Sequence, residues 1–381
     1  MQFIEWERRI LMSKNILNTL SPTLLMGPGP SCVPDPVYEA LSKPTIGHLD
    51  SRFIAIMDEI KKQLQTLMQT GNKLTIPISG TGSAGMETCF VNLIEAGDSV
   101  LILKNGVFGM RMVDVAQRLR ADVDVLEFEW GTPVIVDAVK AKLAEKSYKI
   151  VAVVHAETST GVMNPVGEIS RLLEGSDSLY LVDCVTSLGG IEVRTDDWKA
   201  DALYSGTQKC ISCPPGLAPV SFSDRAIEVL KARKTKVPNW YLDLTMIINY
   251  WEGASRAYHH TAPINMLYGL YAALDVILDE GMENVFARHK ETHEYLVKGI
   301  EKLGLTMTVS PGIRLPMLNA VNIPEGADDE AIRTALIREY DIEIGAGLGP
   351  LAGKIWRIGL MGHTARKENV DRLLVALKAL L

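Results

Sequence analysis

Short apolar runs rich in β-branched residues alternate with longer amphipathic segments between about residues 75 and 225. Such short runs, bounded by turn residues, are typical of strands that are buried on both faces. The expected strands are Thr75–Ile78, Val100–Leu103, Val123–Glu127, Ile150–Val154, Leu179–Val182, Asp201–Tyr204 and Ala218–Phe222. Apolar residues recur at helical spacing between them, over Ala84–Ile94, Met110–Leu119 and Ile135–Ala144. This alternation predicts an α/β domain on a mainly parallel sheet.

The pattern changes after Pro263, where helical spacing runs through Met266–Glu280 and on to Leu303. Extended segments follow at Ala320–Ile323, Ile342–Gly345 and Lys354–Ile358, with helices over Asp329–Glu339 and from about Arg366. This order predicts a smaller α+β domain. We expect an N-terminal arm at residues 1–22, a large α/β domain at 23–262, and a helical connection with the small domain at 263–381.

Composition narrows the class of protein and its partners. The chain has 381 residues, of which 47% are hydrophobic and 22% charged, as in soluble globular proteins. Its net charge of −7 argues against a nucleic-acid partner, and no apolar run reaches the ~20 residues that a membrane span needs. Five scattered cysteines favour the reducing cytoplasm. Cys210 and Cys213 are expected to be buried thiols, since no second pair completes a zinc site, and no metal is expected.

A glycine-rich segment, Ser79–Gly85, lies between an expected strand and an expected helix. Free N–H groups and the positive end of a helix dipole at such a turn suit a phosphate group. Gly80, Gly82 and Gly85 also match the dinucleotide pattern, but the next strand ends at Lys104 without the acid that holds a ribose. The segment therefore indicates phosphate binding, with a purely structural turn as the alternative.

Three further residues suggest chemistry. Asp183 ends an expected strand, where a carboxylate either caps the next turn or keeps the ring nitrogen of a pyridine cofactor cationic. Lys209 lies among small and hydroxyl residues, where desolvation makes a lysine nucleophilic, although most single lysines are simply solvated. Arg357 is either a surface residue or a fork for a substrate carboxylate. A phosphate-binding turn at Ser79–Gly85, an acid at Asp183 for the ring nitrogen and an imine-forming lysine at Lys209 together indicate one cofactor site.

With these residues in place, the chain resembles the class V aminotransferases of fold type I, and is most similar to the alanine–glyoxylate and serine–glyoxylate branches. The motifs that carry the resemblance are Leu25–Pro30, Ser79–Ser83, Glu157–Gly161, Leu181–Asp183, Ser205–Lys209, Tyr258–Thr261, Gly347–Pro350 and Trp356–Gly359. They are in the family's order and span nearly the whole chain.

The resemblance implies pyridoxal 5′-phosphate as the cofactor and assigns roles to particular residues. Lys209 and Asp183 would be catalytic, the first as the Schiff-base lysine and the second on the pyridine nitrogen. The implied cofactor contacts are Thr81, Gly82, Ser83 and Gln208 at the phosphate, Phe108 on the ring, Thr158 near the ring hydroxyl, and Tyr258 and Thr261 reaching the phosphate of the partner subunit. Arg357 would bind the substrate carboxylate, and Gly27 would line the substrate site through its backbone.

The chain departs from the best-known relatives at two of these positions. Phe108 replaces a tryptophan that stacks on the cofactor ring, and an aromatic ring can still stack there. Ser83 replaces a histidine of some relatives and keeps a hydroxyl donor at the phosphate. We therefore expect activity to be kept, with altered cofactor affinity.

The implied activity is transfer of an amino group from alanine or serine to glyoxylate, giving glycine and pyruvate or hydroxypyruvate, in a cytoplasmic homodimer with shared active sites. A ureidoglycine–glyoxylate aminotransferase is the nearest alternative, although that branch tends to carry amides where this chain has His48 and Tyr258. A cysteine desulfurase would need a cysteine beyond Cys213. A nicotinamide dehydrogenase lacks its ribose acid. A catalytically silent protein of the same fold is disfavoured by the complete set of catalytic residues.

Overall fold

A seven-stranded sheet forms the centre of the larger part of the molecule, in the order β2-β10-β9-β8-β5-β3-β4. The computed structural model describes residue 17 and residues 20–252 and 256–381, so most of the expected arm at residues 1–22 lies outside the described residues. The strands are β2 (Leu74–Ser79), β3 (Ser99–Lys104), β4 (Asp122–Glu127), β5 (Ile150–Val154), β8 (Leu179–Asp183), β9 (Ala202–Tyr204) and β10 (Leu217–Phe222). β10 runs antiparallel to its neighbours β2 and β9, and all other neighbouring strands of this sheet are parallel. The expected mainly parallel sheet is confirmed.

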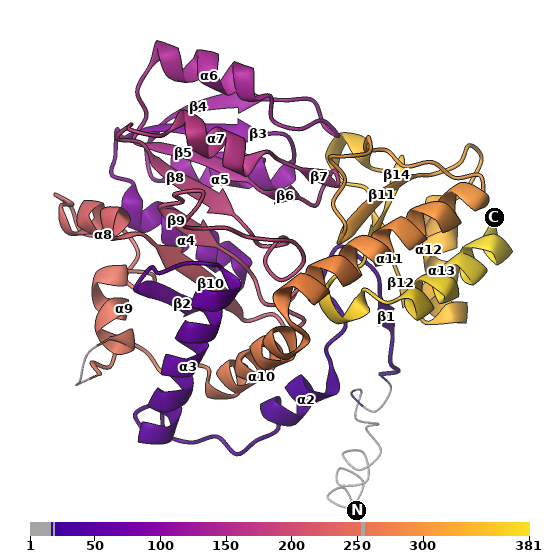
Figure 1. The fold of residues 1–381 in the computed structure, drawn as a ribbon, viewed down its shortest axis with the longest axis horizontal. Helices are drawn as coiled ribbons and strands as arrows, with labels where there is room; N and C mark the ends of the chain where they lie inside the picture. The colour runs from indigo at the N-terminus through magenta and orange to yellow at the C-terminus, as the bar shows by residue number, and fades with distance from the viewer. Residues whose placement is uncertain (1–16, 18–19, 253–255) are drawn as a thin grey trace, which may run out of the picture.

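Helices cover this sheet, as the alternating pattern predicted (Figure 1). The helices of this part of the chain are α2 (Asp35–Leu41), α3 (Ser51–Leu67), α4 (Gly82–Leu93), α5 (Val107–Arg118), α6 (Val136–Glu145), α7 (Val166–Leu172), α8 (Asp224–Lys231) and α9 (Leu244–Trp251). Of these, α3, α4 and α5 contact the strands directly, whereas α2 packs against the later helix α10 (Ile264–Glu280). Every residue of β5, β8, β9 and β10 is buried, which requires cover on both faces of the sheet.

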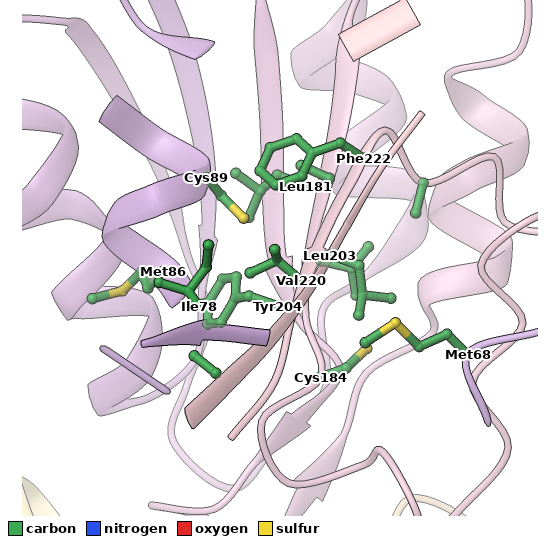
Figure 2. Packing of buried hydrophobic residues seen from close by; sticks show 14 of the residues in the cluster. Met68, Ile78, Met86, Cys89, Leu181, Cys184, Leu203, Tyr204, Val220 and Phe222 are labelled. Atoms are coloured by element: carbon green, nitrogen blue, oxygen red, sulfur yellow. The ribbon is translucent and has the colours of Figure 1, made fainter. Parts of the chain in front are cut away.

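Helix α4 is packed tightly on β9 and β10. Figure 2 shows Met86 and Cys89 of α4 beside Tyr204 of β9 and Val220 of β10. Fully burying a side chain of Met or Val size contributes about 1.5–3 kcal/mol, so this contact fixes the helix firmly. A Cβ on Gly85 would lie 3.0 Å from the Cβ of Ala218, so glycine allows the close approach. The first turn of α4 is thereby held at the carboxyl edge of the sheet.

The C-terminal part contains two long helices, a small sheet and two further helices. The helices are α10 (Ile264–Glu280), α11 (Met282–Lys302), α12 (Asp329–Tyr340) and α13 (Lys367–Leu380), and the antiparallel sheet is β11 (Leu318–Asn322), β14 (Ile355–Gly359) and β13 (Gly345–Ala346). The expected uninterrupted helical stretch is broken at Gly281, whose φ of +84° ends one helix and starts the next. The expected strand Ile342–Gly345 is likewise divided, because β12 (Ile342–Glu343) leaves the small sheet to pair with β1 (Leu24–Leu25).

The start of the described chain packs with its end. Leu24 and Met26 are buried in one hydrophobic cluster with Trp356 and Ile358 of β14. Residues of α10 instead join the cluster that surrounds the large sheet. The division of the chain at residue 262 stays a prediction.

The described residues also bear on the expectations about membranes, metals and cysteines. No described helix is both long and apolar enough to cross a membrane. The described residues contain no group of three or more His, Cys, Asp or Glu side chains arranged to hold a metal. Cys210 and Cys213 are buried and unpaired, as expected, and burial raises the pKa of each thiol to about 12.

Candidate active site

A cavity of about 160 Å³ lies at the carboxyl ends of β8 and β9, where ligands bind in open parallel sheets. The residues that line it are Thr81, Gly82, Ser83, Met86, Phe108, Arg111, Asp183, Val185, Tyr204, Gln208 and Lys209. The structure therefore brings the predicted phosphate loop, ring-stacking residue, acid and lysine around one space.

The first turn of α4 forms one wall of the cavity. Thr81 is the N-cap residue, yet its side chain makes no capping hydrogen bond and remains available to a ligand. A Cβ on Gly82 would lie 3.2 Å from Cγ2 of Val185, so a glycine permits this tight wall. The side-chain oxygen of Gln208 is buried and has no hydrogen-bond partner among the described residues. The unpaired N–H groups at the helix start and the hydroxyls of Thr81 and Ser83 together suit a phosphate group.

Asp183 ends β8, and each oxygen of its carboxylate accepts one hydrogen bond. Oδ1 accepts from the backbone N–H of Val185 at 2.8 Å, and Oδ2 accepts from the Tyr204 hydroxyl at 2.8 Å. Burial raises the pKa of Asp183 to about 6, against the opposing effect of these two hydrogen bonds. A cation in the cavity would keep this carboxylate ionised, so the site is suited to a protonated ring nitrogen.

Lys209 lies in the turn that follows β9 and is 8% exposed. Its Nζ donates a hydrogen bond to the carbonyl oxygen of Pro28. Burial lowers the pKa of Lys209 to about 8, so a substantial fraction of neutral amine exists near neutral pH. Gly29 has a φ of +104°, and a Cβ there would lie 2.7 Å from both Cδ and Nζ of Lys209. A side chain at this position would therefore displace the end of Lys209 and would be strained at this φ.

Arg357 reaches the same region from β14. Its Nε donates to the carbonyl of Ala346 at 2.7 Å, and its Nη1 donates to the carbonyl of Thr158 at 3.4 Å. It is 7% exposed, and burial lowers its pKa to about 10. Arg357 and Thr158 do not line the cavity itself. The positive charge of Arg357 nevertheless helps to lower the pKa of Lys209, so the two groups interact electrostatically.

Tyr258, Thr261 and Gly27 are also outside the cavity lining. Tyr258 is 61% exposed, and its hydroxyl lies 3.3 Å from that of Thr261. Gly27 is buried in the loop after β1, where a Cβ would be 3.7 Å from the backbone N of Gly345. Tyr258 and Thr261 are thus exposed to solvent in this chain, and Gly27 lies close to β13.

Sequence reasoning missed several residues of the site. Tyr204 fits the apolar pattern of a buried strand in the sequence, yet its hydroxyl donates a hydrogen bond to Asp183. Arg111 lines the cavity with its guanidinium 5.0 Å above the Phe108 ring, and its helical spacing from Phe108 was the only available signal. Glu157 lies in the motif Glu157–Gly161 but had no role, although it is completely buried beside Phe108.

A larger cavity of about 310 Å³ lies away from these groups, near the start of β9. Its main charged groups neutralise each other, since Arg225 forms an ion pair with the buried Asp201. The smaller cavity, which is lined by Lys209 and Asp183, is therefore the candidate active site.

Comparison with known proteins fits this geometry. The model of the aminotransferase class-V family matches residues 26–373. The chain belongs to this family. As a class-V aminotransferase it has small amino acids and 2-oxo acids as its substrates, and the family is dependent on pyridoxal phosphate.

Named relatives lie within the same family. The (S)-ureidoglycine–glyoxylate transaminase of Bacillus subtilis is 39% identical over 94% of this chain and 90% of its own length. The alanine–glyoxylate aminotransferase of Rattus norvegicus is 40% identical over 93% of this chain and 86% of its own. The crystal structure of an alanine–glyoxylate aminotransferase from Nostoc sp. superposes with a TM-score of 0.92 at 45% identity, covering 97% of this chain and all of that one. These similarities confirm the expected family, the fold-type I architecture and the transaminase class.

Proposed function

We propose that this class-V aminotransferase transfers an amino group from alanine or serine to glyoxylate. The observation that carries the proposal is the joint placement of Lys209, Asp183 and the first turn of α4 around one cavity. Relatives named alanine–glyoxylate aminotransferase, at about 40% identity over most of the chain, support the choice of substrates.

The residues present fit pyridoxal phosphate. Thr81, Gly82, Ser83 and the side-chain N–H group of Gln208 would hold its phosphate, and Asp183 would pair with its ring nitrogen. Phe108 offers an aromatic face on the cavity wall, and Thr158 would lie towards the ring hydroxyl. When bound, this cofactor supplies an electron sink that makes the α-hydrogen of an amino acid acidic.

Lys209 is the proposed proton carrier and cofactor anchor. With its pKa near 8, its Nζ can be neutral and accept the α-proton of the donor, then return a proton as an ammonium. The Pro28 carbonyl holds Nζ in the site, and Gly29 keeps the space beside it open. A positioned proton carrier is typically worth about 10²–10⁴-fold in rate.

Arg357 is the proposed carboxylate ligand. Its Nε is bonded to Ala346, which fixes the guanidinium plane, while the remaining N–H groups can form a fork to a carboxylate. Gly27 would line the same site through its backbone.

A half-reaction experiment tests the proposal. Purified enzyme with bound cofactor is mixed with alanine or serine, and the visible absorbance of the bound cofactor is followed. We expect alanine or serine to bleach this absorbance, glyoxylate to restore it, and Lys209→Ala to abolish both changes. Full turnover by Lys209→Ala would refute the role of this lysine.

A ureidoglycine–glyoxylate aminotransferase is the second candidate, because the Bacillus subtilis relative has that name. His48 and Tyr258, whose rings lie 5.2 Å apart, oppose this candidate. An amide side chain at these two positions would suit a ureido group better. Ureidoglycine is therefore the discriminating third donor. Faster turnover of ureidoglycine than of alanine and serine would replace our choice.

We also propose a cytoplasmic homodimer with shared active sites. Tyr258 and Thr261 are exposed and do not line the cavity of their own chain, which supports their reaching the cofactor phosphate of the other subunit. All five cysteines are unpaired, as a reducing compartment favours. Sedimentation equilibrium should give twice the chain mass of 41.8 kDa, and a monomer with full activity would exclude shared sites.

A further inference from the structure

Glu157 is completely buried at the end of β6 (Ala156–Glu157), immediately behind the cavity. Both carboxylate oxygens are used as acceptors. Oε1 accepts from the backbone N–H of Ser159 at 3.2 Å and from its hydroxyl at 2.5 Å. Oε2 accepts from the backbone N–H groups of Phe108 at 3.2 Å and Gly109 at 3.4 Å. The carboxylate thus ties the β6 turn to the start of α5.

The first turn of α5 has no cap of its own. Its N-cap residue is Gly106, which has no side chain to accept from the helix N–H groups. Glu157 supplies the acceptor from another element, and the Ser159 hydroxyl accepts from the N–H of Val107 at 3.0 Å. A Cβ on Gly106 would lie 2.4 Å from Cδ of Glu157, so the glycine makes room for this substitute cap. The position of Phe108, two residues into α5, depends on these bonds.

Glu157 also acts on the proposed substrate arginine. The next residue, Thr158, accepts from Nη1 of Arg357, so one turn contacts both α5 and β14. Burial raises the pKa of Glu157 itself to about 7, and in its ionised form Glu157 favours the charged guanidinium and opposes the burial that lowers the pKa of Arg357.

We propose that Glu157 is a positioning residue that fixes the ring face of Phe108 and the charged fork of Arg357 relative to each other. The inference rests on the proposed function, because it assigns Phe108 to the cofactor and Arg357 to the substrate. Glu157 touches neither ligand. It acts through the first turn of α5 and through the turn that carries Thr158.

Glu157→Gln is the discriminating variant. The four groups that face the carboxylate all donate, and an amide of nearly the same shape offers only one acceptor oxygen. One pair of bonds is therefore lost whichever way the amide is turned. We expect the dissociation constant for pyridoxal phosphate and the KM for alanine each to rise about tenfold, as the loss of a hydrogen bond to a charged group predicts. The visible circular dichroism of the bound cofactor should fall, because its ring is held less rigidly.

Asp201→Asn is the matched control. Asp201 is a buried carboxylate that accepts from the backbone N–H of Tyr180 and pairs with Arg225, away from the cavity. Its variant should lower the Tm without changing cofactor affinity, the dichroism or the KM. Ser159→Ala removes one bond to Glu157 and the bond to Val107, so it should change the same quantities as Glu157→Gln to a smaller extent.

The role of Glu157 is refuted, and the proposed function is left standing, if Glu157→Gln and Ser159→Ala lower only the Tm, as Asp201→Asn does. Cofactor affinity, dichroism and KM would then keep their wild-type values. A wild-type protein that binds no pyridoxal phosphate would overturn the proposed function and this inference with it. The two failures are distinguishable, because the first requires a wild type that binds the cofactor.

Discussion

Replacing Asp183 with asparagine should stabilise the cofactor-free protein and at the same time weaken the enzyme. The carboxylate is buried and ends a strand whose every residue is buried. An asparagine can keep the bond from the Val185 N–H through its oxygen and donate its amide hydrogen to the Tyr204 hydroxyl, which can turn to accept. The substitution therefore removes a charge from the interior with little loss of hydrogen bonding.

The size of the effect follows from the pKa of Asp183, which burial raises from 3.8 to about 6. At 1.36 kcal/mol per pKa unit, this shift corresponds to roughly 3 kcal/mol. Its sign is set by proton binding. Between these two pH values the folded protein retains a proton that the unfolded chain has lost, so the wild type loses stability as pH rises through this window. The asparagine variant has no such proton, and its advantage should be complete above about pH 6.

Urea unfolding of cofactor-free wild type and Asp183→Asn, at a series of pH values on both sides of this window, measures the difference. The two proteins should have similar stability at the acidic end and differ by roughly 3 kcal/mol near neutral pH. In the loaded enzyme the same change should lower kcat by about 100-fold or more, as is typical when a preorganised electrostatic partner is lost. A variant that is less stable at neutral pH, or a difference that does not vary with pH, would refute the reasoning.

Three further predictions concern the lysine, the arginine and the loop beside them. Uptake of pyridoxal phosphate by cofactor-free protein should accelerate as pH rises through about 8 and then level off, because only the neutral amine of Lys209 attacks an aldehyde; a pH-independent rate in rapid-mixing absorbance would contradict the lowered pKa. Arg357→Lys should raise the KM for alanine about tenfold or more while cofactor affinity stays nearly constant, and an unchanged KM would exclude the fork. Gly29→Ala should displace Lys209 and abolish most activity, whereas Gly97→Ala, with a similar φ of +87° but open space around it, should lose only about 1 kcal/mol of stability.

The sheet and the main chemical groups were predictable from the sequence because each signal is local. A strand followed by a glycine-rich turn indicates the phosphate loop at Ser79–Gly85, and Asp183 follows its strand directly. Gly281 was overlooked because apolar spacing continues on both sides of it, while its positive φ separates the two helices. The division of Ile342–Gly345 depends on pairing with β1, far away in the sequence.

The supporting residues of the site could not be predicted for the same physical reason. Glu157 accepts hydrogen bonds from the N–H groups of Phe108 and Gly109, which are far from it in the sequence. The pattern of apolar and polar residues carries no signal of such a long-range contact. Tyr204 follows the apolar pattern of a buried strand residue, and only the fold shows its hydroxyl bonded to Asp183. The exposure of Tyr258 and Thr261 is likewise a property of the folded chain.

The strand order has a consequence for synthesis on the ribosome. β2, which leads into the phosphate loop, joins β9, which leads into Lys209, only through β10 between them. The carbonyl of Pro28 that holds Lys209 follows β1, which pairs with β12 near the other end of the chain. A nascent chain therefore carries Lys209 before β10, which joins the two parts of the site, and before β12, which pairs with the strand leading to Pro28. Cofactor capture should accordingly be a late event, and fragments that end before β10 should fail to retain pyridoxal phosphate even when their earlier helices and strands have formed.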